Sequence, residues 1–183
     1  MKEKQFMSWF NWRLILVHFV ATVFVIIGAR QFSYLIDLEF VAALLKDNAY
    51  ELVSHSSPHN HLTIGDRMTI LIYAIYSSAI LGLLFSFVIS LIISWRKKVS
   101  LYNVLIVFSL SFLANRLGVL KISAVIYISN FFGDLFMKYG LQYTFIINGS
   151  LFIILGLFLF FNKWTNRFII KTKQQELLVE DSL

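Results

Sequence analysis

The sequence predicts an all-α integral membrane protein: a bundle of four transmembrane helices, with an amphipathic interfacial helix and a re-entrant or interfacial segment. The chain of 183 residues is 58% hydrophobic and only 14% charged, which is too apolar for a soluble domain of this size. Residues 68–95 carry no charged side chain, and charged residues bracket them on both sides. As a helix this stretch would be about 42 Å long, against a hydrocarbon core of about 30 Å. We expect a single membrane domain organised around it.

The first predicted span covers residues 13–33. Its apolar run is broken only by His18 and Thr22, and aromatic residues flank it. A cleaved signal peptide is the alternative, but Ile27 does not fit the small residue expected three positions before a cut after Ala29. We therefore expect a retained anchor.

An outer segment, residues 34–67, follows the first span. Within it, apolar residues recur at helical spacing opposite charged ones. These apolar residues are Leu38, Val41, Ala42, Leu45, Ala49 and Leu52. We expect an amphipathic helix lying on the membrane surface.

The remaining predicted spans are 68–95, 101–120 and 141–162, with an outer interfacial segment at 121–140 and a tail at 163–183. The third span is imperfect because its uninterrupted apolar part would be only about 21 Å long as a helix. To reach the far side it must carry Asn115 and Arg116 into or near the membrane boundary.

The basic residues predict the orientation of the chain. Residues 1–13, 95–100 and 163–183 hold ten Lys and Arg among 40 residues, whereas 30–67 and 116–140 hold six among 63. By the positive-inside rule, we expect a multi-pass protein of the plasma (inner) membrane with both termini in the cytoplasm. The net charge of +6 therefore indicates membrane orientation rather than binding of nucleic acid.

Small residues recur at every fourth position of the 68–95 stretch, and we call them the small-residue ridge. Its members are Ala74, Ser78, Gly82, Ser86, Ser90 and Ser94. Such a ridge allows another helix to approach the backbone closely, and hydroxyl groups can bond across the contact. The alternative is a polar lining for a pore or a substrate groove.

Four polar residues form the candidate polar or ligand site: His18, Asn115, Arg116 and Asp134. An arginine inside the hydrocarbon costs a few kcal/mol unless it is paired or reaches the headgroups. Asp134 is the only acidic residue between Asp66 and Glu176, so it is the expected partner of Arg116. The alternative for Arg116 is an interfacial anchor. The alternatives for His18 are a proton relay and a hydrogen bond to a neighbouring helix.

Other site chemistry has little support in the sequence. The absence of cysteine excludes thiol nucleophiles, disulfides and thiolate metal sites. His55, His59 and His61 suggest a zinc site, but Pro58 interrupts the helix that would align them. We expect no metal and no cofactor, and the sequence contains no HExxH, Gly-x-Ser-x-Gly or Walker-type motif.

The four-span layout is similar to that of lipoprotein signal peptidase. That family hydrolyses peptide bonds with two aspartates, one just before an arginine and one in an Asn-x-x-Asp pattern. In this chain Asn115 precedes Arg116, and Leu151 follows three residues after Asn148, so neither aspartate is present. Quinone-coupled disulfide oxidases share the layout but require cysteines. Because these acids and cysteines are missing, an intramembrane hydrolase ranks third among the functional hypotheses.

The leading hypothesis is a non-enzymatic accessory or scaffold subunit that packs, through the small-residue ridge, against another membrane protein or against itself. The second is a small carrier or lipid-handling protein with a polar site at Arg116 and Asp134. In either case the expected surroundings are the lipid bilayer.

Overall fold

The computed structural model describes residues 10–45, 62–117 and 137–169. Within these ranges the chain is helical apart from short turns, and they contain no strand. The elements are α2 (Trp12–Ser33), η1 (Tyr34–Asp37), α3 (Leu38–Leu45), α5 (Ile64–Arg96), α6 (Tyr102–Arg116), η3 (Met137–Tyr139) and α8 (Leu141–Phe161). Residues 163–169 are also helical. The predicted all-α class is confirmed.

Three of the described helices are long and apolar enough to cross a membrane: Trp12–Leu45, Ile64–Arg96 and Leu141–Phe161. The predicted third span, 101–120, corresponds in part to α6. This helix has 15 residues, about 22 Å, and ends at Arg116, short of spanning length. Residues 118–120 of that span and most of the predicted 121–140 segment lie outside the described residues.

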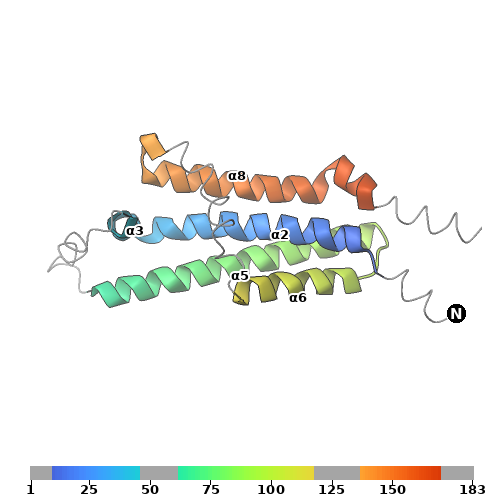
Figure 1. The fold of residues 1–183 in the computed structure, drawn as a ribbon, viewed down its shortest axis with the longest axis horizontal. Helices are drawn as coiled ribbons and strands as arrows, with labels where there is room; N and C mark the ends of the chain where they lie inside the picture. The colour runs from blue at the N-terminus through green and yellow to red at the C-terminus, as the bar shows by residue number, and fades with distance from the viewer. Residues whose placement is uncertain (1–9, 46–61, 118–136, 170–183) are drawn as a thin grey trace, which may run out of the picture.

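Helix α2 is the central element of the bundle. Figure 1 shows α8 on one side of it and α5 and α6 on the other. Helix α2 makes extensive contacts with α8 and α5 and fewer with α6, whereas α5 and α8 barely touch. The expectation that the 68–95 helix organises the chain is therefore wrong. Hydropathy ranks the helices by apolarity, but it does not say which one is surrounded by the others.

Close packing of α2 on α8 depends on glycine. A Cβ on Gly28 would lie 2.6 Å from the carbonyl oxygen of Gly149, and a Cβ on Gly156 would lie 2.8 Å from that of Ala21. Only glycine lets the two backbones approach this closely without displacement. We call Gly28, Gly149 and Gly156 the glycine seam.

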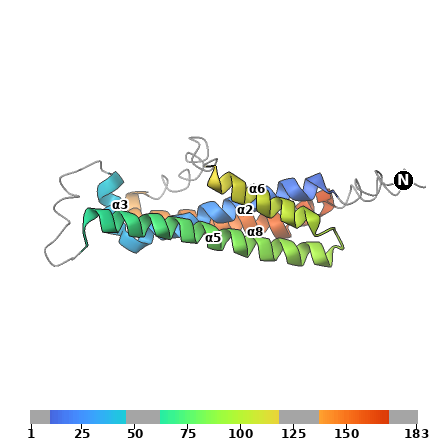
Figure 2. The same cartoon turned by 90° about the horizontal axis from the view of Figure 1, so that it is seen from below.

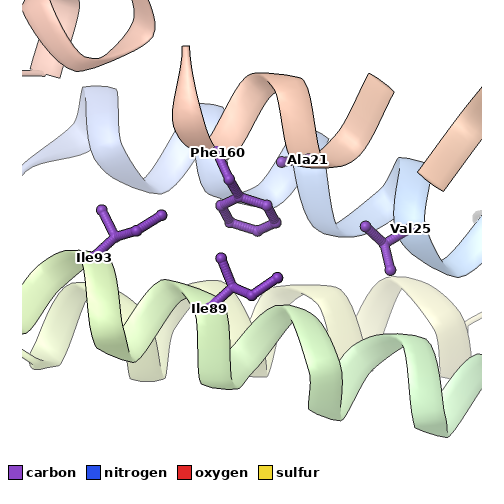
Figure 3. Close-up of a cluster of buried hydrophobic side chains, with 5 residues drawn as sticks. All are labelled: Ala21, Val25, Ile89, Ile93 and Phe160. Atoms are coloured by element: carbon purple, nitrogen blue, oxygen red, sulfur yellow. The ribbon is translucent and has the colours of Figure 1, made fainter. Parts of the chain in front are cut away.

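One aromatic side chain from α8 fills the space between α2 and α5. Phe160, 1% exposed, lies against Ala21 and Val25 of α2 and against Ile89 and Ile93 of α5 (Figure 3). It provides an apolar contact between α8 and α5, which have few other contacts with each other.

A helix is present over Leu38–Leu45, where the sequence predicted an amphipathic surface helix, but its buried face differs from the prediction. Phe40, Val41 and Ala43 are buried, whereas Leu45 is 63% exposed. Phe40 and Val41 pack with Leu71 of α5 and Phe145 of α8. Helix α3 turns out of line with α2 (Figure 1) and covers the far ends of two other helices, so tertiary contacts select its buried side. Residues 46–61 lie outside the described residues.

The first and last described residues lie at the same end of the bundle. The Asn11 side-chain amide donates a hydrogen bond of 3.3 Å to the carbonyl oxygen of Ile169. Helices α2 and α6 run away from this end, which we call the terminal end, and α5 and α8 run toward it. Helix α6 accompanies only the half of α5 nearest the terminal end, as Figure 2 shows from a second direction.

Candidate functional site

The small-residue ridge faces α2. Gly82, Ser86, Ser90 and Ser94 are buried, and Ala74 and Ser78 are partly buried. A Cβ on Gly82 would come within 3.2 to 3.3 Å of atoms of Val25, Ile26 and Ala29. Within this chain α2 already covers the contact side of the ridge. A partner protein would therefore have to bind a different surface from the one expected.

His18 meets this ridge in the half of the bundle nearest the terminal end. Its Nδ1 lies 2.6 Å from the Ser90 hydroxyl oxygen, and its ring contacts Phe160 edge-on at 5.0 Å between centroids. The side chain is 0% exposed, and its Nε2 has no hydrogen-bond partner among the described residues. His18 thus joins α2 to α5 and lies apart from the Arg116 region.

Among the described residues, a narrow crevice lies beside the ridge. It is lined by Thr22, Leu83, Phe87, Ser90, Val104, Val107 and Phe108, and it has no room for a water molecule. The Ser86 and Ser94 hydroxyls are buried beside α2 without hydrogen-bond partners in the described part of the chain. This packing gives no support to a pore or groove along the ridge.

Arg30 and Asn115 form a polar contact at the end of α6 that is remote from the terminal end. The Arg30 Nη2 donates a hydrogen bond of 2.6 Å to the Asn115 Oδ1, which joins the last turns of α2 and α6. Both side chains are half-buried, and the Arg30 Nε is buried without a partner among the described residues. The phenol groups of Tyr34 and Tyr76 lie close enough to interact electrostatically with the guanidinium.

Within the described ranges, Arg30 has no carboxylate at ion-pair distance. The ion pair found there joins Arg67 to Asp37. Arg30 was not among the candidate site residues predicted from the sequence, although it lies inside the first predicted span, 13–33. The available signal was that Arg30 is the only charged residue between Arg13 and Asp37. Its partner Asn115, 85 positions away, was a predicted site residue, but nothing in the sequence indicated that the two would pair.

The predicted pair of Arg116 and Asp134 stays a prediction, because only Arg116 lies among the described residues. Arg116 is exposed on the last turn of α6 and makes no hydrogen bond or ion pair with a described residue. Asp134 lies outside the described residues, as do His55, His59 and His61. The described ranges contain no group of three or more His, Asp or Glu side chains that could hold a metal ion.

An ion pair holds the other end of the bundle, at the start of α5. Arg67 donates from Nε and Nη2 to the two carboxylate oxygens of Asp37, at 2.7 and 2.6 Å. The Arg67 side chain is 7% exposed and lies over the Phe40 ring at 5.1 Å from its centroid. The bidentate geometry fixes η1 and α3 on α5. The pair was not predicted from the sequence, because 30 residues separate its members and no local pattern connects them.

Hydrogen bonds to asparagine side chains join the elements that meet at the terminal end. The backbone N–H of Asn11 donates to the Asn103 Oδ1 at 2.8 Å, and Lys97 donates to the Asn166 Oδ1. Burial lowers the pKa of Lys97. The Arg13 guanidinium lies near the rings of both Trp12 and Phe168, at 5.5 and 4.8 Å from their centroids. These contacts join the start of α2 to the α5–α6 turn and to the helical residues 163–169.

Exposed tryptophan and tyrosine side chains lie at two levels of the bundle. Trp12, Trp95, Tyr102 and Trp164 lie toward the terminal end, and Tyr73, Tyr76, Tyr139 and Tyr143 toward the other. Along α5, Tyr73 and Trp95 are about 33 Å apart at 1.5 Å per residue. This matches the spacing of the aromatic belts on either side of a hydrocarbon core of about 30 Å.

Comparisons with protein families, with curated proteins and with solved structures gave no match for this chain.

Proposed function

We propose that the chain is a multi-pass inner-membrane protein that binds an anionic, membrane-borne molecule at Arg30 and Asn115, in a lipid-handling or carrier role without catalysis of its own. In this proposal α6 continues into a fourth span and both termini are cytoplasmic. The site then lies in the outer half of the membrane.

The single observation that supports this proposal best is a half-buried arginine that bonds an amide instead of a carboxylate. An intramembrane arginine is costly unless its charge is compensated. The Arg30 Nη2 donates to Asn115 in the last turn of α6, so the side chain is held within the bundle. An arginine that only anchored the helix would extend to the headgroups instead.

The test is retention of a bound anion by the purified full-length protein. The protein is extracted gently and its intact mass is measured, with Arg30→Gln and Lys163→Gln as matched variants that each remove one positive charge. We expect the wild type and Lys163→Gln to retain an anionic molecule and Arg30→Gln to lose it. Equal retention by all three proteins, or none by the wild type, would contradict the proposal.

An accessory or scaffold role remains the second candidate, and the uncovered part of α5 favours it. Beyond the end of α6, Tyr76 and Ile80 of α5 are 43% and 48% exposed. A transmembrane helix of another membrane protein could pack there, since the ridge itself is occupied by α2. The same intact-mass measurement tests this role: a bound second protein supports it, and a dimer of this chain would identify the partner as a second copy. A strictly monomeric species would contradict it.

A further inference from the structure

Resting on the proposed anion site, we infer that its ligand is a phosphate group, such as that of a phospholipid headgroup in the outer leaflet, held by Arg30 with Asn115 and the charge of Arg116.

The hydrogen-bond donors at the site outnumber the acceptors. A guanidinium has five N–H donors, and among the described residues Arg30 uses one of them, on the Asn115 Oδ1. The Asn115 oxygen is the acceptor in this contact, so Arg30 does not use the NH₂ group of Asn115. This group adds two donors to the site. The phenols of Tyr34 and Tyr76 can also donate. A phosphate, with three or four acceptor oxygens, matches this set better than a carboxylate with two.

The charge balance favours the same ligand. Arg30 and Arg116 bring two positive charges to the ends of α2 and α6, and Arg116 is paired with no described residue. The carbonyl end of α6 compensates only about half an elementary charge. A phosphate monoester or diester supplies one to two negative charges, which is the amount that the described residues leave uncompensated.

The depth of the site suits a lipid headgroup. Arg30 lies about 27 Å along α2 from Trp12, and Asn115 about 20 Å along α6 from Tyr102. In a hydrocarbon core of about 30 Å, the guanidinium is then only several ångströms below the far boundary. The described part of α6 ends at this depth, while α5 continues past it (Figure 2). The phosphate of a lipid could descend to Arg30 while its acyl chains remain in the bilayer.

The experiment measures binding to the delipidated, full-length protein by native mass spectrometry. The probes are phosphatidic acid, oleate, diacylglycerol and glycerol 3-phosphate. The variants are Arg30→Gln, Asn115→Asp and the control Lys163→Gln. Asn115→Asp is the decisive variant because its carboxylate would pair with Arg30, preserving the helix contact while occupying the anion site.

We expect phosphatidic acid to bind at least about tenfold more tightly than oleate, and diacylglycerol not to bind. Arg30→Gln and Asn115→Asp should each weaken phosphatidic acid at least about tenfold, and Lys163→Gln should not. The melting temperature of Asn115→Asp should equal or exceed that of the wild type. This combination separates a ligand site from a purely structural contact.

The remaining outcomes are distinct. Tighter binding of phosphatidic acid than of glycerol 3-phosphate assigns the phosphate to a lipid, and equal binding assigns it to a soluble phosphate. If oleate binds as tightly as phosphatidic acid and still depends on Arg30, the anion site stands and the phosphate inference fails. If no anion depends on Arg30, both the inference and the proposed function fail.

Discussion

Gly28 of α2 and Gly149 of α8 bring their backbones into direct contact: a Cβ on residue 28 would lie 2.6 Å from the Gly149 carbonyl oxygen. Two such atoms do not approach this closely without moving, and the Gly149 oxygen belongs to the backbone, which moves less easily than a side chain. In a lipid environment the attraction between helices comes mainly from such close packing, because burying apolar surface against lipid or against protein is nearly equivalent. The glycine seam is therefore the contact by which α8 is held on α2.

Replacing Gly28 by alanine should separate α2 from α8. Forcing a methyl group into this space should cost about 1–3 kcal/mol of the free energy of unfolding. Unfolding in a titration with sodium dodecyl sulfate measures the loss. The control is Gly65→Ala, where the new Cβ would meet only the Thr63 hydroxyl at 3.6 Å. Equal stability of the two variants would contradict the role of the seam.

Asp37→Asn should loosen the end of the bundle that is remote from the termini. It leaves the Arg67 guanidinium, 7% exposed, without its bidentate carboxylate. Removing one member of such a buried pair costs about 3 kcal/mol. Limited proteolysis near residues 37–45 and the same unfolding titration report the effect. Glu39→Gln, which removes an exposed charge two residues away, should have little effect, and a similar loss in both variants would exclude the ion pair as the cause.

The hydrogen bond between His18 and Ser90 should appear as coupling in a double-mutant cycle of His18→Leu and Ser90→Ala. Hydrogen bonds between membrane helices are worth about 0.6 kcal/mol on average, with measured values up to about 1.7 kcal/mol. Ser94 serves as the control because its hydroxyl is buried without a hydrogen-bond partner among the described residues. Coupling of His18 with Ser94 as large as with Ser90 would show that the 2.6 Å contact is not the source.

The absence of native cysteine makes the topology directly measurable. Single substitutions Lys98→Cys and Lys163→Cys should be labelled by a membrane-impermeant maleimide from one side only, which we expect to be the cytoplasm. Tyr139→Cys should be labelled from the opposite side, because η3 precedes α8 at the end remote from the termini. Labelling of all three positions from the same side would overturn the arrangement.

Part of the candidate site was accessible from sequence alone. Asn115 and Arg116 were identified because they follow an apolar run that is too short to span. Arg30 was not identified, because a basic residue at the end of an apolar run is ordinary at a membrane boundary. Its bond to Asn115 depends on α6 ending beside the last turns of α2, which no local pattern encodes.

The sequence by itself determined the helical class and the long apolar helices, because hydrocarbon tolerates only backbones whose hydrogen bonds are satisfied within a helix. It also located the small-residue ridge on α5, since a repeat of four places its members on one face. Only the tertiary structure decided that α2 lies at the centre, that α2 covers the ridge, and that Arg30 meets Asn115. In a bilayer an apolar side chain is equally suited to lipid and to protein. Hydropathy therefore does not distinguish these faces, and the close approach of backbones together with a few polar contacts decides which helices meet.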